Sequence, residues 1–480
     1  MAAQVRLFQG LTLVLLTTLF GCGEQAATEQ SPVAVATEIQ DNILTLDSHI
    51  DIPFDFATDS HDPASRPTAQ VDLESMRKGG LKAGFFIVYV GQGARDEAGY
   101  AKAMADAQIK FDAIKRMATS LYPDQIGLAT TADEVEAILA EGRLVALIGI
   151  ENGYTIGRDL TLVERYREQG GLYMTLVHNG HNDIGDSAQP RETLGDAEVE
   201  HGGLSEFGRS VVAEMNRVGM MVDISHVSKD TMLQATELSS APVIASHSSV
   251  NAVYEHPRNL DDDQLDAIKA NGGVVQIVAF DSYLKAVPDD KRASLTGLRE
   301  ALGLTSSEAF RNMDAETRAN YAQGRAMINQ TWPGANVADL VDHIDYTVKR
   351  IGIDHVGIAS DFGGGGGIAG WNHALETFNV TLELVDRGYS RADIEKLWGG
   401  NLLRVLREVE ATAARLQERL RGAVSTRLVV SAIAYQIRRR ASNLAPSSTY
   451  LMALDGASGA VGHGPQFGRC ASVSARWFIV

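Results

Sequence analysis

The chain has 480 residues, 45% of them hydrophobic, with 46 glycines and 12 prolines. This length suits either one large barrel of roughly 250–400 residues with additions, or two domains. The formal net charge of −18 argues against a nucleic-acid partner, because phosphate binding needs a basic surface.

The N-terminal 22 residues have the pattern of an export signal. Arg6 precedes the apolar run LTLVLLTTLF, which is too short for a membrane-spanning helix, and Cys22 follows it. The stretch from Leu19 to Cys22 resembles a bacterial lipoprotein signal box. We therefore expect a lipidated Cys22, a flexible tether over residues 23–40, and a protein anchored by lipid to the bacterial cell envelope, facing the periplasm or the exterior. The alternative is an ordinary secretory signal with an incidental cysteine.

Cysteine usage limits the chemistry of any metal site. Cys470 is the second of only two cysteines, so the chain can form neither a disulfide framework nor a Cys-x-x-Cys zinc site. Any metal must therefore be bound by histidine and carboxylate side chains.

Eight short apolar runs, bounded by turn residues, follow the N-terminal segment. In chain order they are NILTLDSH, GLKAGFFIVYV, RLVALIGIE, GLYMTLVH, GMMVDISH, APVIASH, GGVVQIVAF and DHVGIASD. Apolar strands that alternate with helix-compatible stretches are typical of a parallel sheet covered on both faces. Eight of them predict an α/β fold, a (β/α)8 TIM-type barrel over residues 41–413, with a doubly wound open sheet as the alternative.

The longest connection, over residues 282–353, predicts extra helices before the last strand. The C-terminal residues 414–480 differ from the acidic body, because they contain nine arginines, no lysine and two acidic residues. We expect a poorly ordered basic extension there. The alternative is a basic amphipathic segment that meets anionic lipid.

Ionisable residues stand at the ends of six of the eight runs. Barrel enzymes build their sites at the C-terminal ends of the strands, so these side chains are predicted to converge on one rim. A single histidine in such a place is usually structural, but the set together predicts a metal site. Its members are His49, Asp51, Glu151, His178, His226, His247 and Asp361.

The types of residue indicate the metal and the reaction. His49 and Asp51 are two apart on a strand, so their side chains point the same way and can bind one ion. Glu151 can bridge to a second ion, which His226 and His247 would complete. Imidazole and carboxylate suit Zn²⁺ or a similar divalent ion, and two such ions indicate metal-assisted hydrolysis.

Asp361 ends the last predicted strand, in GIASDFGGGGG. The glycine-rich loop after it lets backbone approach a substrate, and the carboxylate is a candidate general base or proton shuttle. The alternative is a turn or helix-cap carboxylate.

Seven motifs in order, spread over most of residues 44–365, carry a family resemblance. DSHIDIP, ALIGIENG, YMTLVHNGHNDIGDSA, VDISHVS, ASHSSV, HPRNL and GIASDFGG resemble the membrane (renal-type) dipeptidases, peptidase family M19. The resemblance implies an amidohydrolase-type barrel with two Zn²⁺ that hydrolyses dipeptides, often with a D-residue at the C-terminal position. It also suggests a homodimer.

The resemblance also implies residue roles. His49, Asp51, Glu151, His226 and His247 would bind the two zinc ions. His178 would contact the substrate and stabilise the tetrahedral intermediate, and Arg258, in HPRNL, would pair with the free C-terminal carboxylate. Asp361 would take the proton from the attacking water and pass it to the leaving amine. The family usually has SDFDG where this chain has SDFGG, so an acidic residue after Asp361 is missing.

Two other functions remain open at this level. One is a related binuclear amidohydrolase that acts on N-acyl amino acids, cyclic amides or lactones. The other is a non-enzymatic surface lipoprotein on an enzyme scaffold. The carboxylate-anchoring Arg258 favours dipeptides over the first, and the presence of all the ligand residues argues against the second.

Overall fold

The structure is a computed structural model that describes residues 31–65, 69–305, 309 and 313–443. The predicted export signal, Cys22 and the last part of the predicted basic extension lie outside the described residues. No helix within the described ranges is both long and apolar enough to cross a membrane.

The core of the fold is a parallel sheet whose strands coincide with the eight predicted runs. Neighbouring strands pair in the order β1-β2-β4-β5-β6-β7-β8-β9. The backbone N–H of Asp51 donates to the carbonyl of Phe362 at 2.7 Å, which brings the two ends of the sheet together. The predicted (β/α)8 barrel is therefore confirmed, and the open-sheet alternative is wrong. The strands are β1 (Leu46–Asp51), β2 (Ala83–Tyr89), β4 (Leu144–Glu151), β5 (Gly171–Thr175), β6 (Met221–Asp223), β7 (Ile244–Ser248), β8 (Val274–Val278) and β9 (Val356–Ala359).

One further short strand, β3 (Ile126–Leu128), pairs with the first residues of β4. Sequence patterning missed it, because three residues show no measurable alternation. It lies at the start of β4, at the opposite end of that strand from Glu151, and so it takes no part in the candidate site.

The strands separate two apolar layers. Along β4, Val145 and Leu147 join an inner cluster with Phe85 and Tyr173, whereas Ile148 belongs to the layer beneath the helices. Because side chains alternate along a strand, Glu151 continues the inward series of Val145 and Leu147. The last residue of this strand therefore directs its carboxylate into the barrel mouth.

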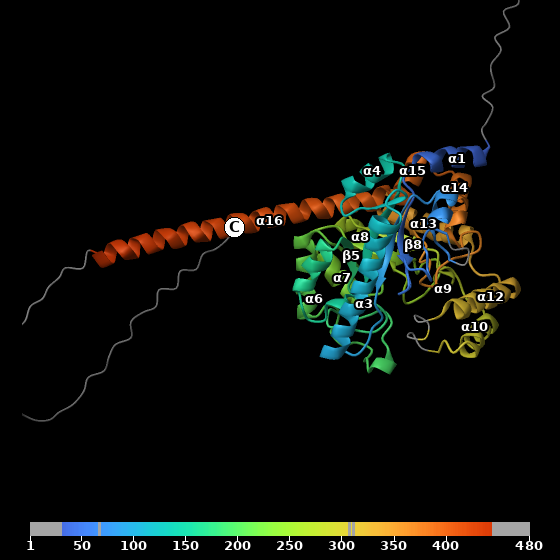
Figure 1. Ribbon diagram of the computed structural model, residues 1–480, viewed down its shortest axis with the longest axis horizontal. Helices are drawn as coiled ribbons and strands as arrows, with labels where there is room; N and C mark the ends of the chain where they lie inside the picture. The colour runs from blue at the N-terminus through green and yellow to red at the C-terminus, as the bar shows by residue number, and fades with distance from the viewer. Residues whose placement is uncertain (1–30, 66–68, 306–308, 310–312, 444–480) are drawn as a thin grey trace, which may run out of the picture. The chain divides into compact units, whose positions relative to one another are not determined.

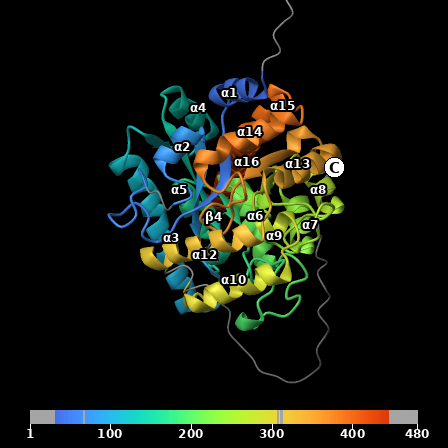
Figure 2. The same cartoon turned by 90° about the vertical axis from the view of Figure 1, so that its right-hand side faces the viewer.

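Helices surround the barrel, and three of them, α9, α10 and α12, are additions between β8 and β9. In the views of Figures 1 and 2, α10 and α12 lie side by side. The predicted extra helices before the last strand are thus present. The helices are α2 (Leu73–Gly79), α3 (Glu97–Arg116), α4 (Ala132–Ala140), α5 (Thr161–Glu168), α6 (Glu206–Val218), α7 (Lys229–Leu238), α8 (Asp262–Asn271), α9 (Asp281–Leu284), α10 (Asp289–Ala301), α12 (Ala315–Thr331), α13 (Val337–Ile351), α14 (Thr377–Asp386) and α15 (Arg391–Glu395).

The structure differs from the predicted tether over residues 23–40, because helix α1 (Pro32–Asn42) occupies its second half. Ser31 caps this helix, and Ala36, Ile39 and Gln40 are buried. The Gln40 side chain also donates to the carbonyl of Gly79 at 2.8 Å. Residues 32–42 are therefore part of the folded body, because the helix buries one of its faces. The sequence pattern of this segment did not distinguish it from a flexible linker.

The predicted boundary at residue 413 is not a structural one. Helix α16 (Asn401–Asn443) runs through it, and the compact unit that contains the barrel ends at Arg419. Gln417 still contacts this unit, since its side chain donates to the carbonyl of Arg217 at 2.9 Å. Residues 420–443 continue as helix, where the sequence predicted a poorly ordered segment.

Candidate metal and catalytic site

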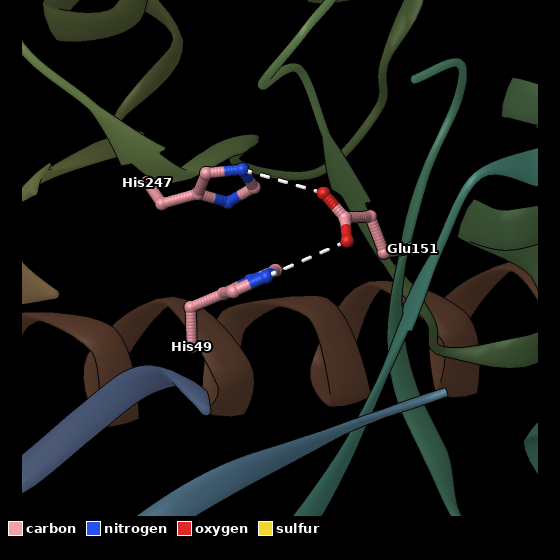
Figure 3. A group of neighbouring side chains, drawn as sticks. All are labelled: His49, Glu151 and His247. Carbon is pink, nitrogen blue, oxygen red and sulfur yellow. Dashed lines mark ion pairs between the residues drawn. The ribbon is translucent and has the colours of Figure 1, made fainter. Parts of the chain in front are cut away.

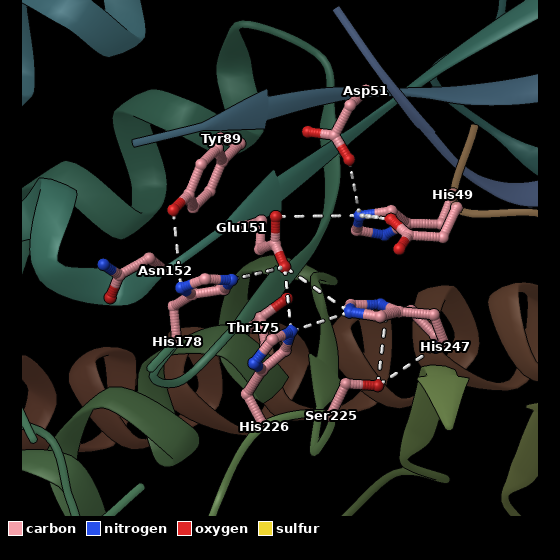
Figure 4. Close-up of polar contacts among 12 residues, drawn as sticks. His49, Asp51, Tyr89, Glu151, Asn152, Thr175, His178, Ser225, His226 and His247 are labelled. Carbon is pink, nitrogen blue, oxygen red and sulfur yellow. Dashed lines mark hydrogen bonds and ion pairs between the residues drawn. The ribbon is translucent and has the colours of Figure 1, made fainter. Parts of the chain in front are cut away.

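Glu151 stands at the centre of the converging side chains, and its two carboxylate oxygens face different partners (Figures 3 and 4). Oε2 lies 3.6 Å from Nε2 of His49. Oε1 lies 3.1 Å from Nε2 of His226 and 3.4 Å from Nε2 of His247. One carboxylate that presents one oxygen to each side is the arrangement that bridges two metal ions.

The first side of the site joins the ends of β1 and β9. Nε2 of His49 lies 3.3 Å from Oδ2 of Asp51 and 3.8 Å from Oδ1 of Asp361. The predicted pairing of His49 with Asp51 on one strand is therefore present. Asp361 reaches the same group because β9 lies next to β1 in the barrel.

The second side gathers His178 and His226, which follow β5 and β6, and His247, which lies within β7. Nε2 of His226 lies 2.8 Å from Nε2 of His247, and Nε2 of His178 lies 3.6 Å from Oε1 of Glu151. The structure thus brings together all seven strand-end residues that the sequence singled out.

Hydrogen bonds to the other ring nitrogen orient two of these histidines. The hydroxyl of Tyr173 donates to the carbonyl of Ser48 at 3.0 Å, so it can only accept from Nδ1 of His49, also at 3.0 Å. The amide oxygen of Asn179 accepts from Nδ1 of His226 at 3.0 Å. A proton on Nδ1 leaves the lone pair of Nε2 free for a metal ion.

The side chains present fit a pair of divalent cations. Nε2 of His49 is buried and makes no hydrogen bond to any residue that the structure describes. Burial alone would lower the pKa of His49, but the charges of Glu151 and Asp51 raise it well above 6.5. The first side therefore favours a positive charge, and imidazole with carboxylate suits Zn²⁺.

The titrating groups have different environments. Burial, together with the negative charges of Asp51 and Glu151, raises the pKa of Asp361 well above 3.8, although His49 opposes this. Burial lowers the pKa of His178 to about 4, with a further contribution from Arg258. The Asp361 carboxyl is therefore biased towards its protonated form, which suits a group that exchanges a proton, and the His178 imidazole is neutral at pH 7.

Two site residues adopt a backbone conformation that side chains other than glycine rarely accept. His226 has φ of 66° and Asp361 has φ of 55°. Such conformations cost roughly 1–3 kcal/mol each and persist only where the surrounding structure enforces them. Here they turn the two side chains into the barrel mouth just after β6 and β9.

Arg258 lies beside the second side of the site. It is 2% exposed, its Nη2 donates to the carbonyl of His247 at 3.0 Å, and its Nε makes no hydrogen bond to the described residues. Together with His226, Ser248 and Asn251 it lines a cavity of about 150 Å³. A buried guanidinium whose Nε–H has no partner can donate a hydrogen bond to a carboxylate in this cavity.

Sequence patterning missed the residues that orient the histidines, namely Tyr173 and Asn179. Asn179 directly follows His178, and a polar residue next to a strand-end histidine is a usable signal. Tyr173 carried none, because it looks like an ordinary apolar strand residue until the barrel closes and brings it to His49.

Comparisons with known proteins agree with this geometry. A family model described as membrane dipeptidase (peptidase family M19) matches residues 33–420. The chain is 33% identical over 367 residues to dipeptidase tcpJ of Claviceps purpurea, covering 75% of this chain and 74% of that protein. It is 32% identical over 397 residues to dipeptidase verJ of Clonostachys rogersoniana, covering 80% and 88%.

Among solved structures, the probable dipeptidase PvdM from Pseudomonas aeruginosa matches with a TM-score of 0.70. The identity is 32%, and the match covers 80% of this chain and 99% of that one. Since the family model spans most of the chain and relatives above 30% identity match along most of their length, the protein belongs to the membrane dipeptidase family, peptidase family M19, whose members are metal-dependent dipeptidases.

Proposed function

We propose that this protein is a binuclear zinc dipeptidase that hydrolyses the peptide bond of free dipeptides, including those with a D-residue at the C-terminal position. The observation that carries the proposal is that one oxygen of Glu151 faces His49 and the other faces His226 and His247. His49, Asp51 and Glu151 would hold one zinc ion, and Glu151, His226 and His247 the other. When bound, the ions supply Lewis-acid activation of the peptide carbonyl and of the attacking water.

Three further residues act on the substrate. The guanidinium of Arg258 pairs with the free C-terminal carboxylate and so fixes the position of the scissile bond. Neutral His178 hydrogen-bonds to the oxygen of the tetrahedral intermediate. Asp361 takes a proton from the attacking water and delivers it to the leaving amine, a role that its raised pKa supports.

We also propose, from the sequence alone, that the protein is exported and held at the bacterial cell envelope by a lipid on Cys22. A homodimer is the assembly that the family resemblance suggests. Metabolic labelling with a radioactive fatty acid tests the first point, since a Cys22→Ala variant should lose the label.

The test of the activity is a hydrolysis panel. Free L-L and L-D dipeptides should be cleaved, whereas the same dipeptides with an amidated C-terminus should be cleaved poorly. Arg258→Ala should raise KM for free dipeptides at least tenfold, because the buried guanidinium that binds the carboxylate is gone. Arg350→Ala, which removes an arginine from the outer surface of α13, is the matched control and should leave KM unchanged.

Two results would contradict the proposal. Equal cleavage of free and amidated dipeptides by the wild-type protein would show that no carboxylate is recognised. Cleavage of N-acyl amino acids or lactones in preference to dipeptides would assign the chain to a different amidohydrolase reaction.

A further inference from the structure

The third metal-binding histidine, His247, is held differently from His49 and His226. Its Nδ1 lies 2.8 Å from the hydroxyl oxygen of Ser246, and that hydroxyl lies 2.7 Å from Oδ2 of Asp223. Asp223 and Ser246 are completely buried, and His247 is 2% exposed. A carboxylate therefore contacts this histidine through one intervening hydroxyl.

A strand irregularity makes the contact possible. Adjacent residues on a regular strand point to opposite faces, so Ser246 and His247 would not meet. The pairing of β7 with β8 shifts register between Ala245 and Ser248. At such an irregularity the alternation breaks, and both side chains reach the same end of the barrel.

Asp223, at the end of β6, is fixed by several donors. Its Oδ1 accepts from the backbone N–H of Ser246 at 2.9 Å and from that of Ser225 at 3.1 Å. Its Oδ2 accepts from the hydroxyl of Ser246 and from that of Thr175. The two backbone N–H donors to Oδ1 fix the position of the carboxylate, so that Oδ2 stays next to the hydroxyl of Ser246.

The count of protons determines the state of His247. The hydroxyl of Ser246 has one proton, and the carboxylate of Asp223, at 2.7 Å, accepts it in preference to the hydroxyl of Ser225, at 3.4 Å. The same oxygen can then only accept from His247, so the imidazole proton must be on Nδ1. The lone pair of Nε2, which faces Glu151 and His226, is left for the metal ion.

The supports of the other two histidines are neutral groups, Tyr173 for His49 and Asn179 for His226. Hydrogen bonds to a charged partner are roughly twice as strong as neutral ones, and the negative charge makes a metal-bound imidazole more basic. Of these three rings, that of His247 reaches a carboxylate through a single hydroxyl group.

We infer that Asp223, acting through Ser246, is a positioning residue that fixes the tautomer of His247 and sets the metal affinity of the second side of the site. The inference rests on the proposed metal site, but it does not depend on which substrate is hydrolysed.

Three variants test it. Ser246→Ala removes the link. Asp223→Asn is isosteric, but its amide N–H would donate to the hydroxyl oxygen of Ser246. That hydroxyl would then donate its own hydrogen bond to Nδ1 of His247, and the imidazole proton would lie on Nε2. Thr175→Val is the matched control, because it removes a buried hydrogen bond to the same carboxylate oxygen without breaking the link to His247.

The measurement is Zn²⁺ affinity in competition with a chromophoric chelator, together with metal content after dialysis and the melting temperature of each metal-free protein. In Ser246→Ala and in Asp223→Asn, the affinity for one of the two Zn²⁺ ions should be ten- to a hundredfold lower than in the wild type. The affinity for the other ion should not change. Thr175→Val should keep both affinities, even if it lowers the melting temperature. Should Ser246→Ala fail to fold, Asp223→Asn gives the answer by itself.

The inference is overturned if both linked variants bind zinc as the wild type does, or if Thr175→Val loses affinity to the same extent. A wild-type protein that binds no divalent ion would overturn both this inference and the proposed metal site. A wild-type protein that binds two zinc ions but cleaves no dipeptide would overturn the proposed substrate alone.

Discussion

At the scale of single residues, glycines allow the loop after β9 to approach the carboxylates of Asp51 and Asp361 closely. Gly363 has φ of 81°, and a side chain there would meet the backbone carbonyl of Asp51. A Cβ on Gly364 would collide with Oδ1 of Asp361 and with Oδ2 of Asp51. Gly363 stands where the SDFDG pattern has its second acidic residue. The backbone at this position has a conformation that glycine adopts most easily.

We predict that Gly364→Ala lowers kcat at least tenfold while the protein stays folded, because the added methyl group displaces the two carboxylates. Steady-state kinetics and circular dichroism measure the two effects. Gly297→Ala in α10 is the control, since a Cβ there meets no other atom within 4 Å. It should leave kcat unchanged and stabilise the protein slightly, by up to about 1 kcal/mol. Wild-type kcat in Gly364→Ala would show that the carboxylates need no such space.

At the scale of elements, the loop between β7 and α8 positions Arg258. The ring of His256 lies 4.5 Å from that of Tyr283, and its Nδ1 accepts from the backbone N–H of Arg258 at 3.1 Å. Arg258 in turn lies over the Tyr283 ring, at 5.4 Å. Burial, and then the charge of Arg258, lowers the pKa of His256 to about 4. The loop is therefore built around a neutral imidazole.

This arrangement predicts a pH dependence. Unfolded His256 takes up its proton near pH 6.5 but folded His256 only near pH 4, so its contribution to stability is lost as pH falls through this window. In His256→Gln the amide oxygen can still accept from Arg258, but it does not titrate. The free energy of unfolding of wild type minus that of the variant, from urea titrations, should therefore decrease from pH 7 to pH 4.5. A constant difference would contradict the assignment.

At the scale of the whole molecule, the barrel collects three carboxylates and four histidines from six different strands into one buried group. Like charges at such distances are costly in a buried site, and bound cations would relieve their repulsion. Metal binding at this site would therefore stabilise the folded protein.

We predict that removal of the metal by a chelator abolishes dipeptide hydrolysis and lowers the melting temperature by several degrees. Binding at a hundredfold excess over Kd stabilises a folded protein by about 2.7 kcal/mol. Scanning calorimetry before and after dialysis measures the shift, and added Zn²⁺ should restore both activity and stability, whereas Mg²⁺ should not. Full activity in protein shown to contain no metal would refute the metal-dependent reaction.

Much of the fold and the site could be predicted, because both follow from local patterns. The apolar runs coincide with strands, and the ionisable residues at their ends lie at one rim because parallel strands all end on the same side. Helix α1 and the continuation of α16 could not be predicted in this way. Whether such segments fold depends on the surface that they cover. Ile39, for example, is buried only because α1 packs against α14.

The sequence by itself determined the barrel, its extra helices and the identity of the residues at its mouth. Apolar strands and the residues that end them can be recognised from short stretches of consecutive residues. Only the tertiary structure decided how these residues are held. Tyr173 and Asp223 support histidines that are 124 and 24 residues away along the chain, respectively, and such contacts exist only after the barrel closes. The two oxygens of Glu151 face different histidines because these histidines come from different strands. The spacing of residues along one strand could not predict that arrangement.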